Sequence, residues 1–507
     1  MPAARRPANA RAAVALSFAS KYATLALRAA SLLALSRLLG PEDFGVFTVA
    51  AAVVSIVFAF AEFGLHSYLV QIPRMTRAAV GAAVGLSCAL CALALGFVAL
   101  LALLAPAGAF GPEARALMLL LALATAVQPI GLPVTAALHR RFRFDLLMAI
   151  DVSRAAAGVA VGVGLAAAGF GAVSLAWGAL ADAAVGTSLG LVLSGGRPVR
   201  PRFSGWGPAL RFGGPLALTG GMRQAGDSGV ALLLGGAFGA AAVGLYNRAL
   251  TVTDTLDKAI VQALSPVVLP VLAREVRRGG ALAPLYLRKL AYLSVIHWPF
   301  FVVLVLLAEP AVRLVLGPRW DDAVPLVRAL AIAGLFGPFT AVSMKFFVAT
   351  GATGFYAKLQ LAAVAVKFAA VAALALVSLQ AAVFGLAVGA GFRALLVTVS
   401  LERRLGVERR EIAAALARGV VVAALAAAGP ALVASLHWNG AGAPMGLPAA
   451  ALAGSLAFIG WLAGLAATGH EFGAELERLA RGALRRTPFP AVGATAIPTE
   501  PPPPRRR

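Results

Sequence analysis

The chain has 507 residues, of which 60% are hydrophobic and only 13% charged, and its mean hydropathy is +0.87. Water-soluble domains need about a quarter charged residues, so a set of soluble domains is excluded and a bilayer must serve as solvent. The net charge of +23 would indicate nucleic-acid binding in a soluble protein, but here the cations lie between apolar stretches, where topology and anionic lipid headgroups account for most of them, and no nucleic-acid partner is expected.

Hydropathy divides the chain into fourteen apolar stretches, each able to cross the hydrocarbon as a helix of roughly 20 residues. Only helices and closed barrels satisfy backbone polar groups in lipid, and these runs are too long for barrel strands. The predicted fold class is therefore an all-α integral membrane protein. The expected spans are 13–39, 46–66, 79–104, 116–136, 144–168, 171–194, 212–237, 240–265, 290–308, 323–344, 359–378, 381–401, 419–436 and 447–469.

Basic residues fall on every second segment between these spans. The eight segments that would share one side hold 31 of the 44 Lys and Arg residues, the seven on the other side hold 3, and 10 lie inside the spans. Lys and Arg beside short loops are retained in the cytoplasm. The bias predicts a multi-pass protein of the inner (plasma) membrane with both termini in the cytoplasm.

The first span carries polar residues along one helical face. It follows three arginines, as a signal sequence would, but it contains Lys21 and Arg28 and lacks a convincing cleavage site, so we expect it to be retained. Lys21, Thr24, Arg28 and Ser31 recur at steps of three and four. A charged side chain at the bilayer centre costs about 2.5 to 3.5 kcal/mol, so this face should meet a wet cavity or a charged partner.

Farther along the first half, charged residues lie one turn apart. Glu62 and His66 are on the second span, and Asp151 and Arg154 are spaced by three on the fifth. We interpret Asp151 and Arg154 as a neutralising pair that lets the helix insert. Prolines in spans 4 and 10 predict bends, because proline removes a backbone donor. These prolines are Pro129, Pro133 and Pro338.

Two polar stripes open the second half of the chain. Span 7 carries Arg223 and Asp227, and span 8 carries Asn247 and Asp254. Lining of a central cavity is one interpretation of the cations Lys21, Arg28 and Arg223, and buried pairing, for example with Glu62 or Asp227, is the other. Glu62, Asp227 and Asp254 could relay protons or bind sodium as coupling groups, and buried pairing is again the other interpretation.

The spans together hold ten cations against seven carboxylates, which leaves the interior mildly positive. An anionic substrate fits that balance better than a cationic one. The Arg side chain suits phosphate, since its planar donor fork engages two oxygens and stays charged.

A short repeat relates the two halves at a spacing of 199 residues. Gly40 corresponds to Gly239, Gly45 corresponds to Gly244, and an aromatic residue follows two positions later in both copies. A second echo relates the segments 110–112 and 316–318, each of which ends in Gly-Pro. The repeats predict two six-helix lobes in parallel orientation, followed by two accessory helices.

The expected organisation follows from the spans, the repeat and the composition of the ends. The C-terminal tail is basic, proline-rich and expected to be disordered. The expected units are a cytoplasmic segment at 1–12, an N-lobe at 13–194, a cytoplasmic loop at 195–211, a C-lobe at 212–401, an accessory pair at 402–469 and the tail at 470–507.

No sequence motif indicates an enzyme or a cofactor. The segment 186–190 matches a nucleophile elbow, but no strand precedes it and it lies within a membrane span. Cys88 and Cys91 lie in mid-span and are interpreted as packing residues. A glycosyltransferase or polymerase would need a substantial outer loop, and the longest one here, 309–322, has 14 residues.

Four segments are similar to bacterial polysaccharide flippases of the multidrug/oligosaccharidyl-lipid/polysaccharide exporter superfamily. Residues 36–45 with 63–65, 70 and 71 resemble the opening of these proteins, and 138–143 resemble the basic loop after their fourth helix. Residues 316–320 with Ala323 resemble the turn before their tenth helix, and 244–246 resemble their eighth. The resemblance covers roughly residues 13 to 401.

This resemblance implies two six-helix lobes around a central cavity and a substrate, an oligosaccharide carried on a polyprenyl pyrophosphate. The cargo would move to the outer leaflet during lipopolysaccharide, capsule or exopolysaccharide assembly, and a polysaccharide polymerase and assembly proteins are possible partners. Family members bind the headgroup with cavity cations. Position and charge select Arg28, Arg223 and Arg248 for that role, with Lys21 beside them.

Two rival functions share the architecture. A drug or cation antiporter predicts an acidic cavity and no need for the two accessory helices. A flippase for the peptidoglycan lipid precursor shares the anionic headgroup of the favoured substrate.

Overall fold

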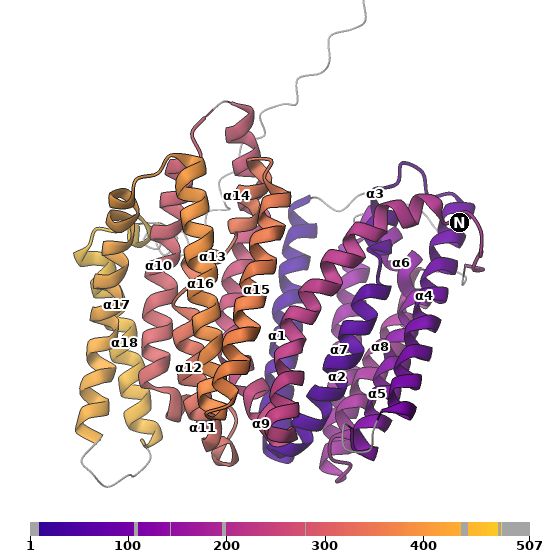
Figure 1. Ribbon diagram of the computed structural model, residues 1–507, viewed down its shortest axis with the longest axis horizontal. Helices are drawn as coiled ribbons and strands as arrows, with labels where there is room; N and C mark the ends of the chain where they lie inside the picture. Colours follow the sequence, from indigo (N-terminus) through magenta and orange to yellow (C-terminus); the bar gives the residue numbers. More distant parts are fainter. Residues whose placement is uncertain are drawn as a thin grey trace, which may run out of the picture.

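The computed structural model describes residues 10–105, 110–141, 143–194, 199–278, 280–437, 445–474 and 478. Side chains are described within these ranges except at 10–22, 194, 255–271, 273, 274, 277 and 437. All regular structure in the described part is helical, as the hydropathy predicted (Figure 1). The tail that we expect to be disordered lies outside the described residues beyond 478.

The first eight helices form the N-lobe, which lies on the right in Figure 1. Within it α7 and α8 approach closely, because Gly158 and Gly162 of α7 face Gly178 of α8. The N-lobe helices are α1 (Ala10–Leu38), α2 (Pro41–Ala61), α3 (Leu65–Gln71), α4 (Arg77–Leu104), α5 (Pro112–Ala126), α6 (Gln128–Arg140), α7 (Phe144–Ala167) and α8 (Val173–Ser194).

The C-lobe lies on the left, and the accessory helices α17 (Arg409–His437) and α18 (Leu447–Ala467) cover its outer side against α10 (Figure 1). The C-lobe helices are α9 (Gly207–Arg277), α10 (Ala283–Leu306), α11 (Ala308–Val315), η1 (Pro318–Ala323), α12 (Val324–Gly334), α13 (Gly337–Thr340), α14 (Ser343–Ala349), α15 (Thr353–Ala375) and α16 (Leu379–Leu405).

Local sequence explains where several helices begin. The Thr76 hydroxyl accepts a hydrogen bond from the Ala79 amide at the start of α4, and Ser378 caps α16 in the same way. Helix α2 begins after Gly40 with Pro41 in its first turn, where the missing proline N–H costs nothing. The Asp43 carboxylate there accepts a hydrogen bond from the Gly40 amide at 3.0 Å.

Helix α9 is a V of two limbs joined at Gly239. The first limb, residues 207–238, and the second limb, residues 240–277, correspond to expected spans 7 and 8. Gly239 has φ 83° and ψ −179°, a backbone conformation that essentially only glycine adopts. The repeat therefore aligns equivalent positions. Gly40 immediately precedes α2, which contains Gly45, and Gly239 immediately precedes the second limb of α9, which contains Gly244.

The expected number of fourteen membrane spans is not confirmed. Eleven helices are long and apolar enough to cross a membrane, or twelve if a bent pair is one span, within the described residues. The count differs at α9, where residues 207–254 form a single candidate span that includes the break at Gly239, and at α1, which is not among the eleven. The bent pair joins residues 318–334 to 337–349 at 45°.

The break in this tenth span confirms the bend expected around Pro338. Helix α13 ends at Thr340, and Val342 takes a left-handed backbone conformation with φ 51° before α14 begins. Lys289 of α10 donates to the Phe339 carbonyl and to the Ser343 hydroxyl, both at 3.3 Å, and so supplies a donor to backbone that the break has freed. Irregular backbone at membrane depth is tolerated where it lines a cavity.

Candidate functional site: two cavities between the lobes

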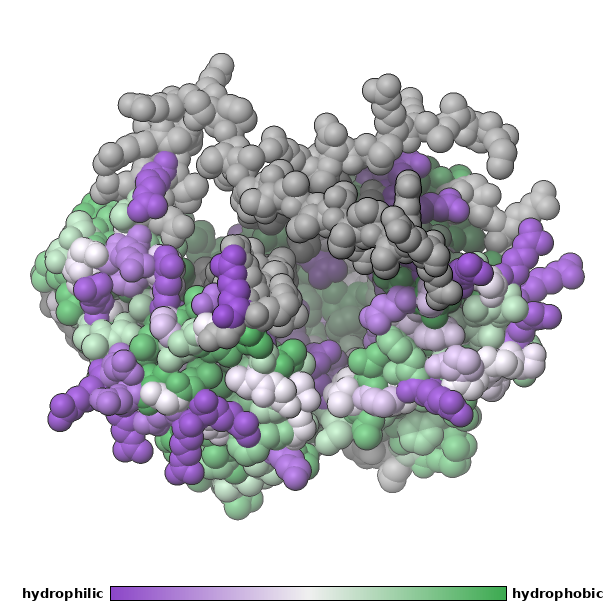
Figure 2. Space-filling model, turned by 90° about the horizontal axis from the view of Figure 1, so that it is seen from above, coloured by the Kyte–Doolittle hydropathy of each residue, from purple (hydrophilic) through white to green (hydrophobic). Residues whose placement is uncertain are grey.

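The molecule has one strongly basic end. The turns that follow α3 and α6 and the segment before α9 carry Arg74, Arg77, Arg140, Arg200 and Arg202. We call this the basic end, and the end with the α1–α2 turn and Gly239 the opposite end. Seen from the basic end, the surface is hollowed between the two lobes, and hydrophilic residues lie inside the hollow (Figure 2).

A cavity of about 870 Å³ is lined by both lobes, and we call it the central cavity. Helix α2 contributes Thr48 and Ser55, while both limbs of α9 and helices α10, α12, α13, α15 and α16 supply the remaining wall. Its charged lining residues within the described part of the chain are Asp227, Asp254, Lys367 and Arg393. The wall of the central cavity thus carries two cations and two carboxylates, and its other described lining residues are uncharged.

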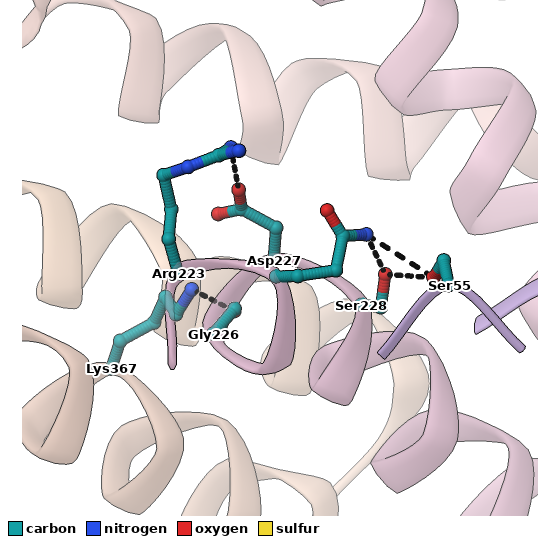
Figure 3. Close-up of polar contacts among 7 residues, drawn as sticks. Ser55, Arg223, Gly226, Asp227, Ser228 and Lys367 are labelled. Carbon is teal, nitrogen blue, oxygen red and sulfur yellow. Dashed lines mark hydrogen bonds and ion pairs between the residues drawn. The ribbon is translucent and has the colours of Figure 1, made fainter. Parts of the chain in front are cut away.

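Lys367 and Arg393 are the cavity cations that the sequence did not single out. Lys367 of α15 donates a hydrogen bond to the Gly226 carbonyl on the first limb of α9 (Figure 3). Arg393 of α16 has a buried Nε with no hydrogen-bond partner. Arg393 thus lines the central cavity without an ion-pair partner among the described residues.

A second cavity of about 600 Å³ lies mainly within the N-lobe, and we call it the N-lobe chamber. Its charged lining residues among those described are Glu62, Asp151 and Arg154. Ala51 and Ser55 line both the chamber and the central cavity, so the two spaces adjoin. The chamber is also lined by Cys91; both cysteines are free and partly buried, in agreement with their interpretation as packing residues.

A hydrogen-bonded bridge separates the two cavities and joins the lobes. The Gln224 amide donates to Ser55 at 3.2 Å and to Ser228 at 2.8 Å, and the two hydroxyls lie 3.2 Å apart. Figure 3 shows the first limb of α9 between two sets of contacts, with Ser55 on one side and Lys367 on the other. Because Gln224 lines the chamber and Ser228 lines the central cavity, a ligand that spans both must pass this bridge.

The structure places the predicted headgroup residues apart from one another. Arg28 is exposed on α1 and lies close enough to Asp151 to interact with its charge. Arg223 pairs with Asp227 at 3.4 Å, with side chains 72% and 61% exposed, an arrangement worth little in free energy. The side chain of Lys21 lies outside the described residues.

Arg248 lies at the lobe contact near the opposite end. Its guanidinium stacks over the Phe44 ring, 4.1 Å from the centroid, and one nitrogen donates to Asn247 at 3.0 Å. Its Nε is buried without a hydrogen-bond partner. Arg248 is therefore covered by an aromatic ring in this conformation and is not among the residues that line either cavity.

The repeated glycines meet one another across the two lobes at the opposite end. A Cβ added to Gly45 would overlap the Ala240 carbonyl, and a Cβ added to Gly244 would overlap the Pro41 carbonyl. The repeat aligns Pro41 with Ala240 and Gly45 with Gly244, so each contact is the symmetry equivalent of the other. We call this reciprocal contact, together with Phe44 and Arg248, the opposite-end seal.

A buried tryptophan completes the closure of that end. Trp320 meets the edge of Phe44 with ring centroids 5.5 Å apart, and its indole N–H donates to the Ser36 carbonyl at 2.9 Å. Two of the segments that resemble the flippases, 36–45 and 316–320, thus pack against each other. Their residues close one end of the molecule.

The expected ion pair of Asp151 with Arg154 is wrong in its partner, because Arg154 bonds to Asp182, although the Arg154 charge still acts on Asp151. Arg154 donates to Asp182 of the neighbouring helix α8, at 2.9 Å from Nε and 2.5 Å from Nη2. The close approach of α7 and α8 at Gly158 brings this carboxylate within reach, and spacing along one helix cannot reveal such a partner. Asp151 keeps its carboxylate toward the N-lobe chamber.

The Arg154 and Asp182 pair predicts a stability effect. Asp182→Asn leaves a half-buried guanidinium without its counter-charge, and we expect about 1 to 3 kcal/mol of destabilisation. Thermal unfolding of the purified protein in detergent measures it, and the reversed pair Arg154→Asp with Asp182→Arg should recover part of the loss. An unchanged midpoint for Asp182→Asn would show that the pair contributes nothing.

The charges on the walls of the two cavities also differ from the net positive interior that the sequence predicted. Lys367 and Arg393 are balanced by Asp227 and Asp254 in the central cavity, and carboxylates exceed cations around the N-lobe chamber. Whole-span counting includes cations such as Arg328, which faces a separate groove of about 350 Å³. Lys367 and Arg393 are the cations on the described cavity walls that make no hydrogen bond to a carboxylate.

Two helical lobes, a polar cavity between them and helices apolar enough to span a bilayer define a multi-pass membrane protein. The polysaccharide biosynthesis protein family matches residues 34–325, and the chain belongs to that family. The lipopolysaccharide biosynthesis protein WzxC of Escherichia coli strain K12 is 24% identical over 310 residues, which are 59% of this chain and 62% of WzxC. The teichuronic acid biosynthesis protein TuaB of Bacillus subtilis strain 168 is 27% identical over 104 residues, 20% of this chain and 22% of TuaB.

Solved structures show the same fold at low sequence identity. The lipid II flippase MurJ in an inward closed conformation superposes with a TM-score of 0.69 and 11% identity, over 90% of this chain and 99% of MurJ. An inward-facing multidrug resistance transporter of the MATE family superposes with a TM-score of 0.56 and 16% identity, over 76% of this chain and 94% of that one.

Proposed function

We propose that this protein is a flippase that carries a polyprenyl-pyrophosphate-linked oligosaccharide from the cytoplasmic to the outer leaflet of the inner membrane by alternating access. The observation that carries the proposal is the polar central cavity between two lobes, which are closed at the opposite end. A sugar hydroxyl moved through hydrocarbon without a partner costs some kcal/mol, so a glycan needs such a wet route. The positive-inside bias supports assigning the basic end to the cytoplasm.

In this proposal the diphosphate binds at Lys367 and Arg393, and the polyprenyl tail stays in lipid. Arg28 and Arg223 are exposed and weakly paired, so they are free to guide the headgroup, and Lys21 lies on the same helix as Arg28. Arg248 would meet the headgroup only after the opposite-end seal opens and Phe44 leaves its guanidinium.

The carboxylates are proposed as the coupling groups. Asp227 and Asp254 line the central cavity beside the cations, and Glu62 lines the N-lobe chamber. Binding of protons or sodium at these groups would change the charge that the anionic headgroup meets. The same two cavity carboxylates are the feature that favours the rival function, an antiporter for organic cations.

Loss of the gene tests the proposal in the native host. We expect surface polysaccharide to disappear and lipid-linked oligosaccharide to accumulate on the cytoplasmic leaflet, which a leaflet-specific glycan label on membrane vesicles measures. Growth with normal peptidoglycan serves as the control. Intact polysaccharide with lost transport of organic cations would establish the antiporter instead, and arrested peptidoglycan synthesis would establish a precursor flippase.

A further inference from the structure

The N-lobe chamber presents hydrogen-bonding side chains that the fold does not use. Glu62, Gln128, Asp151 and Thr187 line it, and none of the four makes a side-chain hydrogen bond within the described part of the chain. Polar groups in a folded protein are normally satisfied by protein, water or ligand. These four are therefore available to water or to a ligand that is rich in hydrogen-bonding groups of its own.

The charge of the chamber favours a neutral occupant over an anionic one. Arg154 already donates hydrogen bonds from Nε and Nη2 to Asp182, whereas Glu62 and Asp151 carry no hydrogen-bonded cation in the described structure. Arg28 lies near Asp151 from α1 but is exposed. A diphosphate would meet the carboxylates of Glu62 and Asp151 here, while in the central cavity it would meet Lys367 and Arg393.

The chamber and the central cavity are placed to hold two parts of one molecule. Ala51 and Ser55 belong to both walls, and the bridge of Ser55, Gln224 and Ser228 stands between the two spaces. The bridge consists of hydroxyl and amide groups, which can exchange their mutual hydrogen bonds for those of a sugar (Figure 3). A headgroup at Arg393 would thus place the attached glycan toward the N-lobe.

We propose that the N-lobe chamber is a glycan subsite that accepts neutral, hydroxyl-rich sugars next to the diphosphate and rejects acidic ones. This inference rests on the proposed function and assigns the two parts of its substrate to different lobes. Sugar hydroxyls donate to the carboxylates of Glu62 and Asp151 and accept from the amide of Gln128 and the hydroxyl of Thr187. A uronic acid at that position would bring a third carboxylate against the first two.

A native cysteine reports occupancy of the chamber directly. The chain has two cysteines, and Cys91 lines the chamber whereas Cys88 is not among the lining residues. The Cys88→Ser variant therefore carries one thiol at the subsite, and Cys91→Ser carries one thiol outside it. An Ala390→Cys substitution in a background that lacks both native cysteines places a thiol on the central cavity wall, one turn from Arg393.

The experiment measures maleimide labelling of these purified variants with three probes: a polyprenyl diphosphate, the same lipid with a neutral dihexose, and the same lipid with a hexuronic acid as first sugar. At ten times the dissociation constant, the neutral glycolipid should slow labelling of Cys91 about tenfold, because about one site in ten stays open. The glycan-free lipid should leave Cys91 unprotected and protect the Ala390→Cys thiol equally well. Cys88 labelling should not change with any probe.

A comparison of the acidic with the neutral glycolipid tests whether the chamber selects sugars by charge rather than by size. It should protect Cys91 about tenfold less than the neutral one, and Glu62→Gln with Asp151→Asn should remove that difference. Thr187→Val is a second variant that changes no charge, and it should weaken protection by both glycolipids alike. Protection of Cys91 by the glycan-free lipid, or equal protection by neutral and acidic glycolipids in the parent, overturns the proposal.

The outcomes also distinguish this inference from the proposed function. If the lipids protect the Ala390→Cys thiol but never Cys91, the glycan subsite is wrong and the flippase assignment stands. If no lipid protects either thiol, both the glycan subsite and the proposed flippase function are wrong. If protection of Cys91 follows pH or sodium and ignores the glycan, the chamber is a coupling site instead.

Discussion

Replacing both Lys367 and Arg393 with neutral side chains should abolish export of lipid-linked oligosaccharide. These are the cations on the described wall of the central cavity, and a hydrogen bond to a charged group is worth about 1.5 to 3 kcal/mol. Loss of two such contacts costs about 3 kcal/mol or more, which is at least a hundredfold in headgroup affinity at about 1.4 kcal/mol per factor of ten. Surface polysaccharide in cells that express Lys367→Met with Arg393→Gln measures the effect.

The same two helices provide a matched control. Lys358 of α15 and Arg404 of α16 are not among the cavity residues, so Lys358→Met with Arg404→Gln removes the same charges and should leave export intact. Adding Asp227→Asn to the cavity variant tests whether an uncompensated carboxylate causes the loss, and export should stay absent. Normal export by the cavity variant at normal protein level would disprove the proposed binding of the diphosphate at Lys367 and Arg393.

Substitution of a seal glycine should hold the opposite end open. Gly45→Ala or Gly244→Ala puts a methyl group where the partner helix has a backbone carbonyl, so α2 and the second limb of α9 must separate. Closely packed backbone cannot yield as a flexible side chain can. A membrane-impermeant thiol reagent added outside cells should label the Ala390→Cys thiol at least about tenfold faster in these variants.

Gly236 supplies the control for that experiment. It lies on the first limb of α9, and a Cβ added there would meet no atom within 4 Å. Gly236→Ala should keep the parent's labelling rate and export. Unchanged labelling in Gly45→Ala at normal protein level would contradict the role of the reciprocal contact.

The sequence predicted the all-helical membrane fold because hydropathy and helix length report the solvent directly. It also predicted that the copies around Gly45 and Gly244 are equivalent, since a turn and a close helix contact both restrict residue type locally. That the two glycines touch each other could not be read from either copy. The contact arises from how the lobes pack, and periodicity along one helix does not encode it.

Sequence reasoning was least informative about the site, for the same reason. Arg154 pairs with Asp182, which is 28 positions away on α8, rather than with Asp151 on its own helix. Lys367 and Arg393 are each the one cation within the expected spans 359–378 and 381–401, with no stripe to distinguish them from Arg328. Only the packing of α15 and α16 against α9 reveals that two of these three share a wall. Arg28 and Arg223 remain predictions for headgroup contact.

The single residue at the apex of α9 gives the molecule a long lever. The limb from 240 to 277 has 38 residues, which at 1.5 Å per residue is about 57 Å. A tilt of about 10° about Gly239 therefore displaces the far tip by about 10 Å, while the apex barely moves. A small backbone rotation at Gly239, beside the contact of Gly45 with Gly244, thus becomes a larger displacement of the limb's tip at the basic end, on the scale of a sugar unit.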